Sequence, residues 1–347
     1  MCDMNANPPA APPRPQIVQI MRPDRGAYSI ERVFADIRAA MTDDVLVRAW
    51  VCPYPSRGVL ARLRGAIAAA REPADVFHVT GDAHYLALFL PRARTVLTVH
   101  DCEFVRRARG LRRALLWLFW LKLPVSRAMR ILVPSQAARR ELTALVAVRP
   151  EKIEVIENPV STGFQPLPEP RHNGRLRILQ VGTKANKNLE RLAAALSGLD
   201  AELRIIGRPT RAQVAALRAG GVSFEWRERL SDAEMRAAYR DCDALAFCSL
   251  SEGFGLPVLE AQMVGRPVVT SNRAPMTDVA GDAAVFVDPE DVGAIRRAFQ
   301  RLIDDRALRR ALVARGVGNA ARYQPRRAAA AHARVYRMLA DRAEAGR

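Results

Sequence analysis

The sequence predicts an α/β protein made of two Rossmann-like domains. The chain has 347 residues, which is more than one hydrophobic core usually holds and which suits two domains. Short apolar runs alternate with segments of helical length, a pattern typical of parallel, doubly wound sheets. Residues 158–174 contain four prolines and two glycines, the composition of a linker. We therefore expect one domain over residues 16–165 and a second over residues 166–324.

The second half of the chain shows the alternation most clearly. Ser231 and Glu234 form a capping box, in which each side chain bonds the backbone N–H of the other, so a helix is expected to begin there. Repeated strand–helix–strand order implies right-handed crossovers and a parallel sheet. The predicted strands are 176–182, 203–207, 222–226, 244–248, 267–270 and 284–287. The predicted helices are 188–196, 210–219, 231–241 and 257–264.

The first half repeats the pattern less regularly. Ser135 is a suitable N-cap for a helix over residues 136–146. An Ala- and Arg-rich segment from Pro325 to residue 347 predicts one long helix, which we expect to pack back on the first domain. Residues 1–15 are rich in Ala and Pro, lack the pattern of a signal peptide and are predicted to be a disordered lead-in. The predicted strands are 16–21, 44–50, 76–79, 96–100, 131–134 and 153–156.

The composition limits the class of protein. With 49% hydrophobic and 26% charged residues, the chain is neither collagen-like nor an unstructured polyelectrolyte. Lys and Arg number 54 against 36 Asp and Glu, and the net charge of +18 favours an anionic partner. Only four of the basic residues are lysines, so arginine could simply be the default surface cation of this chain. That possibility weakens the argument from charge.

Cysteines and apolar runs bear on location. Five cysteines lie far apart without the spacing of metal ligands, which predicts free thiols in a reducing, cytoplasmic setting. No apolar run approaches the 18 or so residues that a membrane-spanning helix needs. A peripheral position on the inner face of the cell membrane stays open.

The stretch Ser-Leu-Ser-Glu-Gly-Phe-Gly-Leu-Pro-Val-Leu-Glu-Ala at residues 249–261 is the most informative motif. It follows a predicted strand, turns at Gly253-Phe254-Gly255 and enters a helix at Pro257. Ligands bind at the carboxyl ends of strands in such sheets, and a glycine turn at a helix N-terminus lets backbone N–H groups approach a phosphate. Glu252 in the loop and Glu260 in the helix could then face one ligand from different depths.

This motif, followed by Gly-Arg-Pro-Val-Val-Thr-Ser-Asn and Asp-Val-Ala-Gly-Asp-Ala-Ala-Val-Phe-Val-Asp-Pro, resembles the donor-binding signature of family-4 retaining glycosyltransferases. Further matches lie at residues 95–101, 152–160, 176–188 and 203–207. The resemblance implies the GT-B fold, two Rossmann-like domains facing a central cleft. It also implies transfer of a sugar from a nucleotide-sugar donor to a hydroxyl acceptor, such as a lipid-linked or growing cell-surface glycan, with retention of configuration and without a metal or other cofactor.

The resemblance also implies roles for individual residues. Glu252 matches the glutamate that holds donor sugar hydroxyls, and Glu260 matches the one on the nucleotide ribose. Lys187 matches the cation on the donor diphosphate, and His100 matches the first-domain histidine that faces the sugar. The other implied donor-binding positions are Gly26, Gly182, Thr183, Lys184, Gly253, Phe254, Gly255 and Leu256. Base recognition is expected near residues 222–227.

Three stretches depart from the family pattern, of which Asn158-Pro159-Val160 in place of the usual Asn-Gly-Val affects no assigned role. Thr183 stands where an arginine is usual, which leaves Lys184 as a possible substitute on the diphosphate. The usual Gly-Gly loop of the first domain is reduced to Gly26-Ala27. For the mechanism, Asp101 is the nearest candidate for a carboxylate nucleophile of the kind that retaining hydrolases use. We favour the front-face mechanism proposed for the family, in which the departing phosphate helps to take the acceptor proton.

Several interpretations remain open at this stage. His78 and His84 flank Asp82, so the histidines could line the acceptor cleft, although a metal site there is not expected. The segment from Arg106 to Leu121 joins an arginine cluster to an all-round apolar stretch with three aromatics. It could rest on an anionic membrane surface or be a helix partly covered by its neighbours.

Two other functions compete with sugar transfer. A nucleotide-sugar epimerase of GT-B type would share the donor site but need no acceptor. A nucleic-acid-binding protein would explain the charge, yet no known binding motif is present and no nucleic-acid partner is expected.

Overall fold

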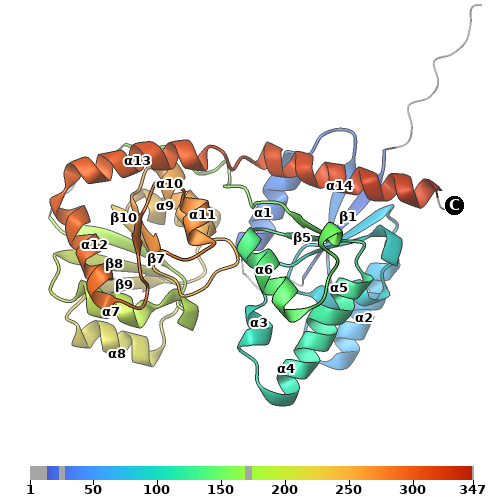
Figure 1. Ribbon diagram of the computed structural model, residues 1–347, viewed down its shortest axis with the longest axis horizontal. Helices are drawn as coiled ribbons and strands as arrows, with labels where there is room; N and C mark the ends of the chain where they lie inside the picture. Colours follow the sequence, from blue (N-terminus) through green and yellow to red (C-terminus); the bar gives the residue numbers. More distant parts are fainter. Residues whose placement is uncertain (1–13, 23–27, 169–173, 346–347) are drawn as a thin grey trace, which may run out of the picture.

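The computed structural model describes residues 14–22, 28–168 and 174–345. It contains two six-stranded sheets, one in each half of the chain, and all pairings within them are parallel. Figure 1 shows the two sheets as separate lobes side by side, each covered by helices on both faces. The α/β class predicted from the alternating pattern is confirmed.

The sheet of the first lobe has the strand order β2-β1-β3-β4-β5-β6. Its central strands β3 and β4 are buried at every residue, which explains why their sequences are mostly apolar. The strands are β1 (Gln16–Met21), β2 (Leu46–Val51), β3 (Val76–Val79), β4 (Thr95–Thr98), β5 (Arg130–Val133) and β6 (Ile153–Val155).

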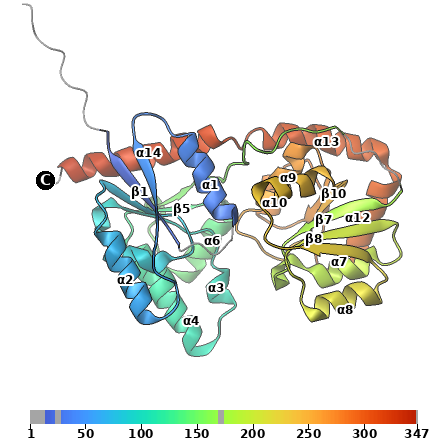
Figure 2. The ribbon, with the colours of Figure 1, turned by 180° about the vertical axis from the view of Figure 1, so that it is seen from behind.

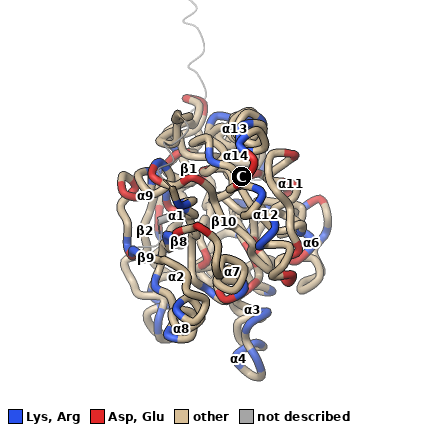
Figure 3. Tube along the Cα trace, turned by 90° about the vertical axis from the view of Figure 1, so that its left-hand side faces the viewer, with Lys and Arg blue, Asp and Glu red and all other residues tan. Residues whose placement is uncertain are grey.

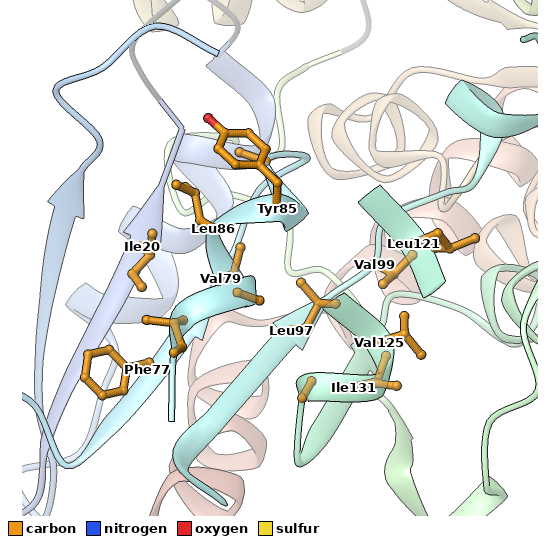
Figure 4. Packing of buried hydrophobic residues seen from close by; sticks show 14 of the residues in the cluster. Ile20, Phe77, Val79, Tyr85, Leu86, Leu97, Val99, Leu121, Val125 and Ile131 are labelled. Atoms are coloured by element: carbon orange, nitrogen blue, oxygen red, sulfur yellow. The ribbon is translucent and has the colours of Figure 1, made fainter. Parts of the chain in front are cut away.

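Helices cover this sheet on two sides. Figure 4 shows the larger core, where side chains such as Phe77, Val79 and Leu97 from adjacent strands meet Leu121 and Val125. The elements associated with that side are α2 (Val59–Ala70), η1 (His84–Phe89), α3 (Glu103–Arg106), α4 (Gly110–Leu116), η3 (Trp117–Lys122), α5 (Leu123–Arg127) and α6 (Gln136–Leu145). The opposite side carries α1 (Tyr28–Ala39) and α14 (Pro325–Ala345). Two short turns, η2 (Arg92–Arg94) and η4 (Pro150–Lys152), complete the lobe.

The sheet of the second lobe has the order β12-β11-β10-β7-β8-β9. The strands are β7 (Leu176–Val181), β8 (Ala201–Ile206), β9 (Ser223–Arg227), β10 (Ala244–Phe247), β11 (Val268–Ser271) and β12 (Val285–Val287). One face packs on η5 (Ala185–Lys187), α7 (Leu189–Leu196), α8 (Arg211–Ala219) and α12 (Val292–Asp304). The other packs on α9 (Asp232–Arg240), α10 (Leu256–Val264) and α11 (Met276–Ala280), and α13 (Arg306–Ala320) contacts both α10 and α12.

The twelve strands predicted from apolar runs are all present, and their ends differ from the predicted ones by at most two residues. The capping box of Ser231 and Glu234 is confirmed at the start of α9. Ser135 caps α6 by accepting a hydrogen bond from the backbone N–H of Ala138, as predicted. Local chemistry therefore specifies where these elements begin.

The last helix, α14, belongs to the second half of the sequence but packs on the first lobe (Figures 1 and 2). Its buried Leu339 and Tyr336 join a core with residues of β1, β3 and β4. The Tyr336 hydroxyl bonds Nδ1 of His78 at 2.7 Å and accepts from Nε2 of Gln19 at 3.1 Å. The chain thus crosses between the lobes twice, and the backbone N–H of Val160 in one crossing donates to the Tyr323 carbonyl in the other at 2.9 Å.

The segment from Arg106 to Leu121 forms the C-terminus of α3, then α4, and most of the π-helical turn η3. Trp117 donates its indole N–H to the Leu145 carbonyl at 2.8 Å, and Trp120 packs on the Tyr85 ring with centroids 5.0 Å apart. Both tryptophans are half-buried and pack against the first-lobe core, which favours a helix partly covered by its neighbours. The exposed large apolar side chains of this region are Leu111, Leu115 and Phe119.

The state of the cysteines and the lengths of the helices can be compared with the sequence-based expectations. Cys52, Cys102, Cys242 and Cys248 are buried free thiols. Within residues 14–22, 28–168 and 174–345, no helix combines the length and the apolar composition needed to cross a bilayer.

Candidate active site

The carboxyl ends of the two sheets meet at a close backbone contact. Gly253 lies so near the carbonyl oxygen of His100 that a Cβ at this position would overlap it. The Ser135 hydroxyl, besides capping α6, donates to the Gly253 carbonyl at 2.7 Å. Gly255 has a φ of +107° and begins α10, a backbone conformation that suits glycine. The two glycines of the motif therefore serve different needs, close approach between the lobes and a sharp turn into the helix.

Glu252 and Lys187 form the centre of this region. Nζ of Lys187 lies 2.6 Å from Oε1 of Glu252 and 4.5 Å from the centre of the Phe247 ring, and both charged side chains are mostly buried. Gly182 has a φ of +89°, and a Cβ there would press on the Lys187 side chain at 2.9 Å. The residues assigned by resemblance to the donor sugar and the diphosphate are thus direct partners of each other.

A polar chain links this pair to the first lobe. Asn186 Nδ2 donates to the Ser251 carbonyl at 2.9 Å and lies 3.4 Å from Oε1 of Glu252. Arg107 in turn donates to Oδ1 of Asn186 at 2.9 Å. This contact could not be predicted from the sequence, because Arg107 and Asn186 lie 79 positions apart and in different lobes.

His100 is held in one tautomer. Its Nε2 lies 2.7 Å from the Thr80 carbonyl oxygen, which can only accept, so Nε2 carries the proton. Burial lowers the pKa of His100, so the ring is neutral at pH 7 and Nδ1 is left as a hydrogen-bond acceptor. The neighbouring Asp101 accepts from the backbone N–H of Glu103 at 3.0 Å, which ties it to the start of α3.

Glu260 is buried and paired with the other lobe. Its carboxylate accepts from the Tyr239 hydroxyl at 2.7 Å and forms an ion pair with Arg32 of α1. Burial raises the pKa of Glu260, while Arg32 and the Tyr239 hydroxyl oppose that rise. Arg32 also lies 3.4 Å from Asp232. The group assigned to the nucleotide ribose is therefore bound here to an arginine that sequence reasoning missed.

The remaining predicted donor-binding positions have different surroundings. The Thr183 hydroxyl donates to the Arg208 carbonyl at 2.8 Å, while Lys184 is exposed beside it. The Phe254 ring is buried in the second-lobe core against Tyr323, which leaves only its backbone for a ligand. Leu256 packs on the α1 cluster across the lobes. Gly26 lies outside the described residues.

His78 and His84 do not converge on a common site. His78 points to the α14 side, where it bonds Tyr336 and the Thr98 hydroxyl, the latter at 2.7 Å. His84 bonds the Trp120 carbonyl at 2.7 Å on the other side of the sheet. Both are buried, so the interpretation that they line the acceptor cleft is wrong. Among the residues that the structure describes, no three His, Cys, Asp or Glu side chains are placed to hold a metal ion.

The edge strand β9 was expected to lie near the nucleotide base. It presents Phe224 and the exposed Trp226, whose rings stack with centroids 6.1 Å apart. The Arg227 carbonyl at its end accepts from the backbone N–H of Gly207 at 2.8 Å.

Two family models match this chain. The model for Glycosyl transferases group 1 matches residues 168–317, and that for Glycosyltransferase Family 4 matches residues 18–164. The chain is also similar to the MMP alpha-(1->4)-mannosyltransferase of Mycolicibacterium hassiacum. The two are 28% identical over 307 residues, which span 80% of this chain and 74% of that protein.

Solved structures share the whole fold. Anabaena Alr3699/HepE, crystallised with UDP and glucose, matches with a TM-score of 0.73 at 14% identity, over 92% of this chain and 99% of that one. WaaG, a glycosyltransferase involved in lipopolysaccharide biosynthesis, matches with a TM-score of 0.70 at 14% identity, also over 92% and 99%. These likenesses confirm the GT-B fold, with two Rossmann-like domains facing a central cleft.

Proposed function

This chain belongs to the group 1, family 4 glycosyltransferases, and we propose that it transfers a hexose from a nucleotide sugar to a hydroxyl group of a glycan or lipid-linked acceptor, with retention of configuration. The observation that carries the proposal is the Glu252–Lys187 pair, held where the carboxyl ends of the two sheets meet. The similar mannosyltransferase supports a mannosyl group as the transferred sugar. The role of WaaG in lipopolysaccharide biosynthesis supports a lipid-linked acceptor.

The second lobe supplies the groups that hold the donor. As the glycosidic bond breaks, the nucleoside diphosphate gains negative charge, and a fixed cation beside a helix N-terminus stabilises it. Lys187 and the N-terminus of α10 at Gly255 provide these two features. When Lys187 turns to the diphosphate, the carboxylate of Glu252 is released to accept hydrogen bonds from donor sugar hydroxyls. The ion pair is thus a resting arrangement of two donor-binding groups.

The first lobe faces the reacting sugar through His100. Because Nε2 donates its proton to the Thr80 carbonyl, Nδ1 is the atom that accepts a hydrogen bond from a sugar hydroxyl. The Asp101 carboxylate accepts a hydrogen bond from the backbone N–H of Glu103 at the N-terminus of α3. This contact supports a front-face mechanism over nucleophilic attack by Asp101. In that mechanism the departing phosphate takes the proton from the acceptor hydroxyl as the new bond forms.

The experiment that tests the function is a panel of nucleotide sugars, including mannose donors, screened by thermal shift and then by product analysis. We expect one donor to stabilise the protein and to yield free nucleoside diphosphate with a transferred or hydrolysed sugar. An epimerised donor with no sugar released would instead identify a GT-B epimerase. Salt-sensitive binding to nucleic acid with no donor binding would contradict the proposal altogether.

We further propose that no metal ion is needed, because Lys187, together with the exposed Lys184, supplies the positive charge that a divalent cation supplies elsewhere. Turnover is therefore expected to be unchanged in excess EDTA. The measurement is the rate of nucleoside diphosphate release before and after chelation and dialysis. Complete loss of activity that one added metal restores would contradict this account of the diphosphate site.

We also propose a cytoplasmic location with peripheral binding to the inner face of the cell membrane. Leu111, Leu115 and Phe119 are exposed along α4 and η3, and Arg109, Arg112 and Arg113 lie beside them, also exposed. Figure 3 shows that this tip projects from the body of the lobe and carries several Lys and Arg positions. Apolar side chains among arginines suit a surface of anionic lipid.

Binding to liposomes is accordingly expected to require anionic lipid, to weaken with salt and to fall when Leu111 and Phe119 are both replaced by serine. The measurement is the fraction of protein that co-sediments with the liposomes. Phe286→Ser, which removes an exposed aromatic from β12 in the other lobe, is the matched control and is expected to bind like the unaltered protein. Equal sedimentation with neutral lipid, or none with any lipid, would leave a soluble acceptor as the better assignment.

A further inference from the structure

A cavity of about 450 Å³ lies in the first lobe beside the candidate active site. It combines an aromatic and apolar lining with four arginines and a single carboxylate. We call it the arginine pocket. Its lining residues are Arg22, Ser56, Arg62, Asp82, Ala83, Tyr85, Phe104, Arg107, Ala108, Arg112, Leu116 and Trp120.

The charges in the arginine pocket do not balance. Arg22 is paired with Asp82 at 2.9 Å, and Arg107 is paired with Glu103 at 2.6 Å. Arg62 and Arg112, in contrast, have no carboxylate partner within the described parts of the chain. Two guanidinium groups beside one cavity thus lack a protein counter-charge, which favours an anionic ligand.

The guanidinium group of Arg62 is held in one orientation by contacts within the protein. Its guanidinium lies over the Trp120 ring, 4.5 Å from the centre, and its Nε donates to the Ser56 carbonyl at 3.1 Å. These two contacts fix the plane of the group and leave its terminal nitrogens for a ligand. A planar guanidinium with two parallel N–H donors matches two oxygens of a phosphate.

One end of the arginine pocket reaches the donor site. Arg107 lines the pocket and donates to Asn186, which contacts Glu252. A molecule anchored by its anionic group among the arginines can therefore present a hydroxyl to the reacting sugar. The aromatic lining from Tyr85, Phe104 and Trp120 suits the apolar part of such a molecule.

We infer that the arginine pocket binds the phosphate or diphosphate of a phosphorylated acceptor, an assignment that rests on the proposed function. Arg62 and Arg112 contact the phosphate oxygens, and the aromatic lining packs against the group that the phosphate joins to the acceptor. The same chemistry occurs in a lipid diphosphate and in a soluble sugar phosphate, so the probes are chosen to separate these sources.

The test is isothermal titration calorimetry on three proteins that all carry Lys187→Ala, so that the cation of the candidate donor site cannot bind the probe. The first has no other change, the second carries Arg62→Gln and Arg112→Gln, and the third carries Arg64→Gln and Arg71→Gln. Arg64 in α2 and Arg71 at its C-cap are exposed and lie outside the arginine pocket, so the third protein is a charge-matched control. The probes are inorganic pyrophosphate, glucose 6-phosphate and farnesyl diphosphate.

We expect the phosphorylated probe that binds to lose at least about tenfold in affinity in the second protein and to bind the third like the first. Tighter binding of farnesyl diphosphate than of pyrophosphate assigns the pocket to a lipid acceptor, and equal binding of glucose 6-phosphate assigns it to a soluble one. Equal affinity in all three proteins, or no binding to the first, overturns the inference. Donor hydrolysis by the chain with Lys187 intact tests the proposed function separately.

Discussion

Replacing Glu252 or Lys187 with alanine is expected to lower turnover by at least about a hundredfold while the fold is retained. Each change removes a charged group aimed at the donor and leaves its partner, 2.6 Å away in the resting protein, without a counter-charge. The measurement is the rate constant for sugar transfer at saturating donor, with circular dichroism to establish that each variant is folded.

Glu290→Ala is the matched control for this pair of variants. It also removes a carboxylate from an ion pair in the same lobe, but Glu290 and its partner Arg273 are both exposed. Turnover in this control is expected to equal that of the unaltered protein. Normal turnover in folded Glu252→Ala and Lys187→Ala would show that the donor site lies elsewhere.

Gly253→Ala is expected to lower turnover by at least about tenfold, because only glycine lets the motif loop touch His100. The added Cβ would lie well inside 3.0 Å of the His100 carbonyl oxygen, and a backbone atom cannot swing aside as a side chain can. Relief requires the two lobes to move apart, which separates His100 from the donor groups. Turnover and thermal unfolding are measured together, since each lobe should still fold.

Gly318→Ala in α13 is the control for Gly253→Ala. A Cβ at Gly318 meets open space, and alanine is a better helix former than glycine. This variant is expected to keep full turnover. Full turnover in Gly253→Ala as well would contradict a working state in which the two backbones are in contact.

The fold could be predicted because both sheets are parallel and covered on both faces. Central strands such as β3, β4, β10 and β11 are buried at every residue, so they or the residues beside them stand out as short, mainly apolar segments. Helix starts were marked by local chemistry, as at Ser231 and Ser135. The donor motif could also be recognised from the sequence, because its two glutamates, its glycines and its proline lie within one short stretch.

The contacts between the lobes could not be predicted. Arg32 and Glu260 lie 228 positions apart, and nothing local to α1 marks one arginine among many as the partner of a buried carboxylate. The sequence leaves the orientation of the aromatic stretch open for a related reason. Its residues are apolar all round the helix, so the pattern cannot say which side meets protein, and the structure places Trp117 and Trp120 inward and Phe119 outward.

The two crossings between the lobes, joined by the hydrogen bond from Val160 to Tyr323, set the degrees of freedom of the whole molecule. A single chain connection would allow the lobes to twist, slide and rotate relative to each other. Two connections joined by a hydrogen bond oppose twisting and sliding more than rotation about a single axis. We therefore expect any opening and closing of the cleft to follow one hinge axis, which would return the His100 and Gly253 backbones to the same contact. The α14 helix, which anchors the second crossing to the first lobe, therefore contributes to the alignment of active-site groups that it does not touch.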